Sequence, residues 1–169
     1  MPKCIVAEDE KLLSAALQRE LAKAWPELEI VAVCEDGGEA LEAIAIHQPD
    51  VAFLDIRMPG LTGMEVAAAA ADASPHTLVV FVTAYDQYAV DAFERGAIDY
   101  LLKPVVAERL AQTVTRLRSR LADAARHARR TGDLAKDMIG RFDEAPDEPL
   151  TWITAGSGKA TRLILVDDV

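Results

Sequence analysis

Residues 51–60 of the 169-residue chain read Val-Ala-Phe-Leu-Asp-Ile-Arg-Met-Pro-Gly, an apolar run that ends at Asp55 and leads into a proline and a glycine. A short apolar run bounded by turn residues is typical of a buried strand whose last residue opens onto a loop. In an α/β sheet, ligands bind at the carboxyl ends of the strands. The stretch therefore predicts that the Asp55 carboxylate lies at the functional edge of a sheet.

Apolar runs of this kind alternate with helical patterns along the first two thirds of the chain. Strands are expected over residues 3–7, 29–34, 51–55, 77–83 and 98–102. Helices are expected after them, the first three ended by Pro26, Pro49 and Pro75, the fourth between Asp86 and Gly96, and the fifth from near Val105. Near-continuous apolar strands that alternate with helices indicate a parallel sheet covered on both faces. We predict an α/β fold, a doubly wound, flavodoxin-like (βα)5 domain whose five-stranded parallel sheet has the order 2-1-3-4-5.

Polar side chains stand at the ends of four of these strands. Glu8 and Asp9 follow the first, Asp55 ends the third, and Thr83 and Lys103 end the fourth and fifth. In the order 2-1-3-4-5 the first and third strands are neighbours, so the three acids should lie side by side. This set fits an aspartate that accepts a phosphoryl group, because such a transfer requires alignment and neutralisation of charge. Lys103 would supply a positive charge to one phosphoryl oxygen, and Thr83 a hydroxyl to another.

Mg²⁺ is the cofactor that this chemistry predicts. It offsets the negative charges of nucleophile and donor, and it prefers carboxylate and carbonyl oxygens with several waters retained. Asp9 and Asp55 would be direct ligands, and the backbone carbonyl of Arg57 a third. Glu8 would act through a water molecule.

Together these motifs resemble the receiver domain of two-component response regulators, over residues 3 to about 120. The resemblance rests on Glu8-Asp9, Asp55-Ile-Arg-Met-Pro-Gly, Thr83-Ala84 and Lys103-Pro104, which occur in the family's order. It implies that a histidine kinase phosphorylates Asp55. It also implies a switch in which Thr83 moves toward the phosphoryl group and the ring of Tyr100 swings inward. The peptide bond before Pro104 is expected to be cis.

The last part of the chain carries a second resemblance. We expect the receiver domain over residues 1–121, a helix extension and linker over 122–148, and a fragment similar to the opening strands of a LytTR-type DNA-binding domain over 149–169. Breaks are expected at Gly132, Gly140, Pro146 and Pro149, and two strands over 150–154 and 161–166, with Gly156 and Gly158 in the loop between them. The chain is therefore expected to stop inside a second domain and to reach DNA only through the missing part.

The fifth helix carries apolar residues at alternating spacings of four and three, namely Leu110, Val114, Leu117, Leu121 and Ala124. This seam fits either a single amphipathic helix packed on the sheet or a helix that packs first and then pairs with a second copy. Both interpretations remain open. We expect a symmetric homodimer through the fourth helix, fifth strand and fifth helix, with Arg95, Asp99 and Arg116 as candidate charged contacts.

Charge and composition limit the class of protein. The net charge of −10 divides into −11 over residues 1–105, +5 over 106–131 and −4 over 132–169. The acidic first part argues against nucleic-acid binding there, and the basic stretch is favoured as a solvated helix face over a nucleic-acid patch. The two cysteines lie on expected strands, and no secretory signal or membrane-length apolar run is present, so we predict a cytoplasmic protein without membrane contact.

Two rival functions are less consistent with these residues. A phosphatase of the haloacid dehalogenase kind would need a second acid two residues after the nucleophile, and Arg57 occupies that place. A binding module that is never phosphorylated is disfavoured by the complete acid set. We therefore predict a protein that is not an enzyme but a response regulator, which controls transcription through a DNA-binding domain missing from this chain.

Overall fold

The computed structural model describes the backbone of residues 1–85, 96–143, 152–157 and 160–165, and side chains as far as residue 136. The helix expected between Asp86 and Gly96 lies outside the described residues. The chain divides into two compact units, Met1–Ala125 and Arg126–Val169. Among the described residues, no helix combines the length and the apolar character needed to cross a membrane.

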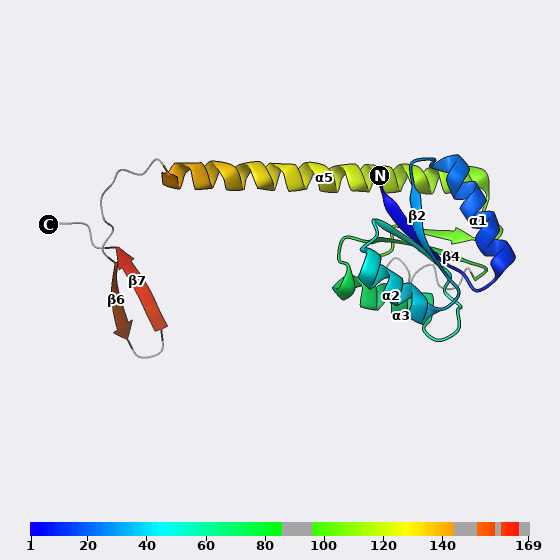
Figure 1. Cartoon of the computed structure of the whole chain (residues 1–169), viewed down its shortest axis with the longest axis horizontal. Coiled ribbons are helices and arrows are strands. Elements are labelled where there is room, and N and C mark those ends of the chain that lie inside the picture. The colour runs from blue at the N-terminus through cyan, green and yellow to red at the C-terminus, as the bar shows by residue number, and fades with distance from the viewer. Residues whose placement is uncertain (86–95, 144–151, 158–159, 166–169) are drawn as a thin grey trace. The chain divides into compact units, whose positions relative to one another are not determined.

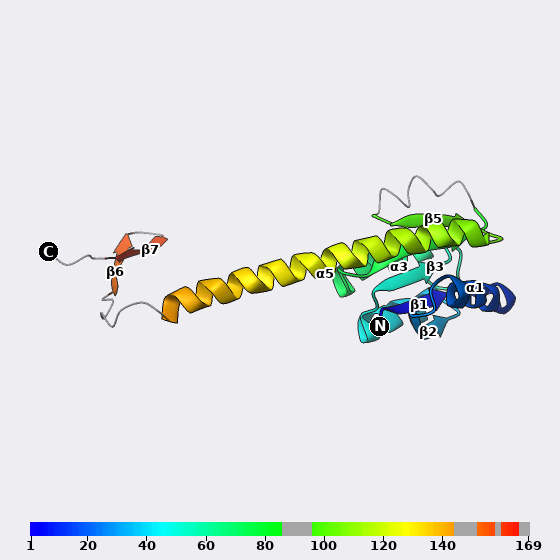
Figure 2. The ribbon, with the colours of Figure 1, turned by 90° about the horizontal axis from the view of Figure 1, so that it is seen from above.

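The first unit is built on a parallel sheet of five strands in the order β2-β1-β3-β4-β5, which confirms the predicted topology. Figure 2 shows β5, β3, β1 and β2 in succession across the sheet. The strands are β1 (Lys3–Ala7), β2 (Glu29–Cys34), β3 (Val51–Leu54), β4 (Leu78–Thr83) and β5 (Asp99–Leu102). β1 and β2 match the expected ranges, and β3, β4 and β5 are each one residue shorter at one end.

Helices on both faces complete this unit. They are α1 (Lys11–Ala24), α2 (Gly37–His47), α3 (Gly63–Ala73) and the first part of α5 (Ala107–Asp143). Two begin at side-chain caps. Asp36 accepts a hydrogen bond from the Glu39 amide at 2.8 Å, and Thr62 forms a reciprocal capping box with Glu65. These caps satisfy amides that have no partner inside the helix, and they fix where α2 and α3 begin.

The core has two layers because successive strand residues point to opposite faces. On β1, Cys4 and Val6 pack with α1 and α5, whereas Ile5 and Ala7 pack with α2 and α3. Figure 1 shows α1 and α5 on one side of the sheet and α2 and α3 on the other. Both faces of the sheet are therefore buried, and the strand ends remain as the open edge.

The fifth helix continues further than the sequence predicts. The breaks expected at Gly132 and Gly140 are wrong, because α5 runs on to Asp143. A glycine inside a helix costs only about 1 kcal/mol relative to alanine. The residues around these two glycines include many good helix formers, and no proline occurs between Val105 and Pro146. The segment predicted as extension and linker is therefore helical over most of its length.

The second unit contains the predicted hairpin. Strands β6 (Trp152–Ser157) and β7 (Ala160–Leu165) pair in antiparallel fashion. Gly156 pairs with Thr161, and Ser157 pairs with Ala160. The expected position of Gly156 in the loop is therefore wrong, because Gly156 lies within β6. The connection is accordingly shorter than predicted. Two strands alone are common to many folds, and the likeness to a LytTR-type domain stays a prediction.

Candidate functional site

The acids predicted to act together are adjacent in the structure. Strands β1 and β3 are neighbours, with Ala7 opposite Leu54, and the Asp55 amide donates a hydrogen bond of 2.9 Å to the Ala7 carbonyl. One carboxylate oxygen from each of Glu8, Asp9 and Asp55 lies within 4.8 Å of the other two. Local strand endings and sheet order thus gather three carboxylates at one edge.

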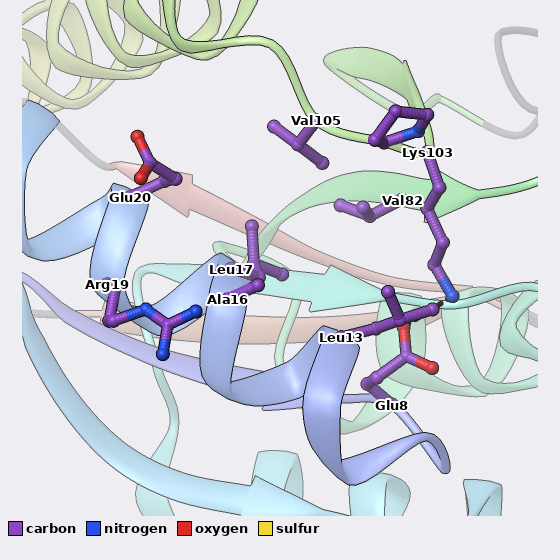
Figure 3. A pocket seen from close by; sticks show the side chains of 10 residues that line it. Glu8, Leu13, Ala16, Leu17, Arg19, Glu20, Val82, Lys103 and Val105 are labelled. Atoms are coloured by element: carbon purple, nitrogen blue, oxygen red, sulfur yellow. Dashed lines mark ion pairs between the residues drawn. The ribbon is translucent and has the colours of Figure 1, made fainter.

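Lys103 joins this cluster from the end of β5. Its Nζ lies 2.7 Å from Asp55 Oδ2 and 2.5 Å from Glu8 Oε2, and Figure 3 shows its side chain pointing toward Glu8. Its backbone amide donates to the carbonyl of Thr83 at 3.0 Å. The peptide bond between Lys103 and Pro104 is cis, as expected. One ammonium against three carboxylates leaves an excess of about two negative charges.

Burial makes this charge balance energetically important. Glu8 and Asp55 are 3% and 6% exposed. Burial raises the pKa of Glu8 above the usual glutamate value, although hydrogen bonding to Lys103 acts in the opposite direction. Burial also acts to lower the pKa of Lys103, but its hydrogen bonds to Asp55 and Glu8 outweigh this and raise that pKa. Lys103 is therefore held in its charged form, but its single positive charge does not neutralise the three carboxylates.

The donor set fits a hard divalent cation. Oxygens on opposite sides of an octahedral Mg²⁺ lie about 4.2 Å apart, since each metal–oxygen distance is about 2.1 Å. Oxygens as far as 4.8 Å apart would have to move slightly or act through water. Asp9 is exposed and can move, and Glu8 is already bonded to Lys103, which suits an indirect role. The role of the Arg57 carbonyl as a metal ligand stays a prediction. The Arg57 amide donates to Asp55 Oδ1 at 3.2 Å.

Thr83 supplies an independent sign that a ligand belongs here. It ends β4, is fully buried, and its hydroxyl has no hydrogen-bond partner within the described residues. A buried hydroxyl without a partner costs about 1–3 kcal/mol, so the place of Thr83 at the end of β4 is consistent with a hydrogen bond to a ligand. Tyr100 lies across from Phe81 on the neighbouring strand and is 8% exposed. Its ring is thus already inside in this structure, and the predicted movement stays a prediction.

The loop after Asp55 is held by Gly63, whose close packing the sequence did not reveal. A Cβ on Gly63 would lie 2.1 Å from the Asp55 carbonyl oxygen. The Gly63 amide donates to the carbonyl of Ile56 at 2.9 Å. Only glycine permits α3 to begin this close to the strand end, so this position fixes the course of the loop around Asp55.

A second contact that the sequence did not reveal bridges two loops. The Arg57 guanidinium lies over the Tyr85 ring, 4.1 Å from its centroid, and donates to the Tyr85 hydroxyl at 3.3 Å. The sequence offered one signal for this contact. Arg57 and Tyr85 each lie two residues beyond an expected strand end, at Asp55 and Thr83, so both belong to loops at the same edge of the sheet.

A cavity of about 230 Å³ opens beside the acid cluster. Figure 3 shows Glu8 and Lys103 at one end and Arg19 and Glu20 toward the other. Its walls come from α1, the end of β4 and the turn after β5, and are mainly apolar: Leu13, Ala16, Leu17, Val82, Pro104 and Val105. An apolar hollow that ends at the candidate site can receive a side chain or a helix edge from another molecule.

One expected charged contact is contradicted by the structure. Asp99 was a candidate for an ion pair across a dimer, but it is fully buried and bonded to Arg109 and Arg116 of its own chain. Arg116 is likewise engaged inside the chain, and Arg95 lies outside the described residues. A buried carboxylate with internal partners cannot contact a second copy.

Comparison with known proteins identifies the family. The sequence profile of the response regulator receiver domain matches residues 4–115. The chain belongs to the response regulator receiver family. The chain is 44% identical over 169 residues to an uncharacterized response regulatory protein of Vibrio cholerae, covering 98% of this chain and 63% of that protein. It is 42% identical over 118 residues to the transcriptional regulatory protein BtsR of Salmonella typhi, covering 70% of this chain and 48% of BtsR.

Solved receiver structures agree with the fold. The REC domain of AraT, a response regulator from Geobacillus stearothermophilus, gives a TM-score of 0.68 at 32% identity, covering 73% of this chain and 98% of that domain. The receiver domain of the putative response regulator NarL from Mycobacterium tuberculosis gives 0.62 at 34% identity, covering 68% and 93%. The flavodoxin-like receiver fold therefore matches, and the chain spans only half to two thirds of the curated relatives cited above.

Proposed function

We propose that this receiver accepts a phosphoryl group on Asp55 from a phosphohistidine of a histidine kinase. One Asp55 oxygen forms the new bond to phosphorus while the bond from phosphorus to the histidine nitrogen breaks, and the imidazole leaves. The observation that carries the proposal is the buried Asp55 carboxylate, 2.7 Å from Lys103 and clustered with Glu8 and Asp9. Bound Mg²⁺ would neutralise charge on the acids and on the phosphoryl oxygens.

The residues around Asp55 would orient it before the donor arrives. The Arg57 amide binds Oδ1 and Lys103 binds Oδ2, so the plane of the carboxylate is fixed. Such preorganisation lowers the entropic part of the barrier. After transfer, Lys103 would contact one phosphoryl oxygen and the hydroxyl of Thr83 another. These contacts would shift a two-state equilibrium in the loop after Thr83, with Tyr100 as the neighbouring switch residue.

The cavity beside Lys103 supports a docking place for the kinase. Its apolar walls suit an apolar helix face that presents the phosphohistidine, and its polar end adjoins Glu8 and Lys103. The exposed Leu12 of α1 and Val106 after β5 extend apolar surface near these elements. The histidine kinase would therefore bind along α1 and the turn after β5.

The proposed output is control of transcription. BtsR is a transcriptional regulatory protein, and the similarity to the Vibrio cholerae protein covers 98% of this chain, beyond the receiver itself. We propose that β6 and β7 are the opening strands of a LytTR-type DNA-binding domain, through which DNA would be bound. Both cysteines are free and buried, which suits the reducing cytoplasm that we propose as the location.

We also propose a symmetric homodimer through the fourth helix, β5 and α5, in which α5 contributes its exposed part and the buried Asp99 makes no contact. Leu110, Val114 and Leu117 are buried in the chain's own core, as the single-helix interpretation predicts. From Ala122 to Lys136 every side chain is exposed. An isolated helix of about 15 residues, the length of this exposed stretch, is marginal in water. A second copy would therefore pair through the heptad positions from Leu121 onward, where Ala124 and Ala128 lie.

Mass measurement tests the central proposal. Incubation with acetyl phosphate and Mg²⁺ should add one phosphoryl group to the parent protein and none to Asp55→Asn. Asp72→Asn is a matched control, because Asp72 is an exposed acid on α3. A parent protein that gains no mass, although Mg²⁺ binds, would favour the binding module that is never phosphorylated. An Asp55→Asn protein that still gains mass would move the acceptor to another residue.

A further inference from the structure

Asp99, the first residue of β5, is a buried carboxylate that the proposed chemistry does not use. Arg109 donates to both of its oxygens, Arg116 donates to Oδ2 at 2.7 Å, and Thr113 donates to Oδ2 at 2.8 Å. The Tyr100 amide donates to Oδ1 at 2.9 Å. Burial would raise the pKa of Asp99, but the bonds from Arg109 and Thr113 hold it below the usual value. The carboxylate is thus charged and its acceptor sites are filled.

The side-chain donors all come from one face of α5. Positions 109, 113 and 116 are separated by four and three residues and therefore share a helix face. Arg109 also donates to the Tyr100 carbonyl at 3.2 Å and to the Thr113 hydroxyl at 3.0 Å. In the described residues, the bonds of Asp99 connect β5 with α5 and with no other element. They fix both the position and the rotation of the first turns of α5 relative to the strand.

Strand β5 is also linked directly to the acid cluster. It lies at the edge of the sheet and pairs only with β4 among the described strands. It carries Tyr100 and is followed at once by Lys103, whose Nζ contacts both Glu8 and Asp55. A change at the acid cluster therefore reaches β5 through Lys103, while the Asp99 network joins β5 to α5.

We propose that Asp99, Arg109 and Arg116 are positioning residues that make β5 and α5 move as one unit when Asp55 is phosphorylated. This inference rests on the proposed phosphorylation. The network transmits displacement of β5 to the first turns of the helix that continues to Asp143. A carboxylate bonded to two arginines resists separation because each charged hydrogen bond is stronger than a neutral one. The unit would thus respond as a whole.

Hydrogen exchange, measured by mass spectrometry with and without acetyl phosphate and Mg²⁺, tests this coupling. In the parent, phosphorylation should change the exchange of amides in residues 99–103 and in residues 107–120 together. In Asp99→Asn, the change in β5 should remain, while the change in α5 should fall by about tenfold, the factor by which one charged hydrogen bond alters a local opening equilibrium. Arg116→Gln should show the same loss in part. Arg116 is half exposed, so this variant keeps the test open if Asp99→Asn does not fold.

Arg118→Gln is the matched control. Arg118 is also on α5, but it pairs with Glu27 at 2.8 Å and lies over the Trp25 ring, so its loss should leave the response of α5 unchanged. A purely structural role for Asp99 would speed exchange equally with and without phosphorylation and leave the difference intact, which would overturn the proposal. So would a phosphorylated parent in which α5 does not respond. Intact mass is measured on the same samples, and a parent that gains no phosphoryl group would instead overturn the proposed function and this inference with it.

Discussion

Replacing Lys103 with methionine should destabilise the receiver at pH 7 and much less at pH 5. Lys103 pairs with Glu8 at 2.5 Å and with Asp55 at 2.7 Å, and both carboxylates are buried. Removing one partner of a buried ion pair typically costs about 3–5 kcal/mol, because an uncompensated charge remains. Methionine keeps a side chain of similar length, so the change acts mainly on charge.

In the variant, Glu8 can avoid carrying an unpaired buried charge by taking up a proton. The free energy of that protonation is therefore an upper limit to the loss of stability. For a carboxyl with the ordinary pKa of 4.5, taking up a proton costs about 3.4 kcal/mol at pH 7 and about 0.7 kcal/mol at pH 5. Each unit between the pH and the pKa contributes about 1.36 kcal/mol. We therefore expect a loss of about 3 kcal/mol at pH 7 and about 1 kcal/mol at pH 5. The pKa of Glu8 is raised in the folded state, so the folded variant binds more protons than the unfolded chain and loses stability as pH rises. The pKa of Lys103 is also raised, so its own contribution is fully present below 10.5 and is constant across this window.

Urea unfolding at the two pH values, with and without Mg²⁺, measures these differences. Mg²⁺ should restore part of the lost stability at pH 7, because it supplies positive charge to the same acids. Lys23→Met is the control. Lys23 forms an exposed pair with Glu20, and its loss should cost less than about 1 kcal/mol at either pH. A loss below about 1 kcal/mol for Lys103→Met at pH 7, or an equal loss at both pH values, would refute the reasoning.

Three further changes probe the metal, the loop and the dimer. Asp9→Asn should weaken Mg²⁺ binding by at least about tenfold in calorimetric titration, since a direct carboxylate ligand is lost; unchanged affinity would remove Asp9 from the metal site. Gly63→Ala should lower the unfolding free energy by about 2 kcal/mol or more, because the new Cβ would meet the Asp55 carbonyl at 2.1 Å. Gly132→Ala, whose Cβ meets nothing within 4 Å, should instead be stabilising or neutral, and equal effects would disprove the close approach. Ala128→Glu should abolish dimerisation of the phosphorylated protein in sedimentation, whereas Ala122→Glu, off the heptad positions, should not; a monomeric parent would count against the dimer itself.

The long-range placement of the site was available from the sequence. Strand endings at Ala7 and Asp55 are local signals, and the order of the sheet follows from general rules for parallel connections. Together they bring Glu8, Asp9 and Asp55 to one edge, because parallel strands end at the same side. The hairpin at the end of the chain was likewise predictable from two apolar runs around glycines.

The course of α5 shows where sequence patterns reach their limit. The heptad seam identified the apolar face, but it did not show that the face is covered by the chain's own sheet through Leu117 and exposed beyond Leu121. It also did not show that the helix passes Gly132. Periodicity states which residues share a face, and only the neighbouring elements decide what covers it.

The same distinction governs the polar side chains. Asp99 was predicted to be a charged contact across a dimer, but its burial and its bonds to Arg109 and Arg116 depend on how α5 packs against β5. The contact between Arg57 and Tyr85 depends on two loops that meet only in the folded chain. The sequence by itself determined which groups stand at the strand ends, because strand periodicity and chain connectivity are local properties. The partners of each charge were decided by the tertiary structure, because burial and hydrogen bonding depend on elements that are distant along the chain.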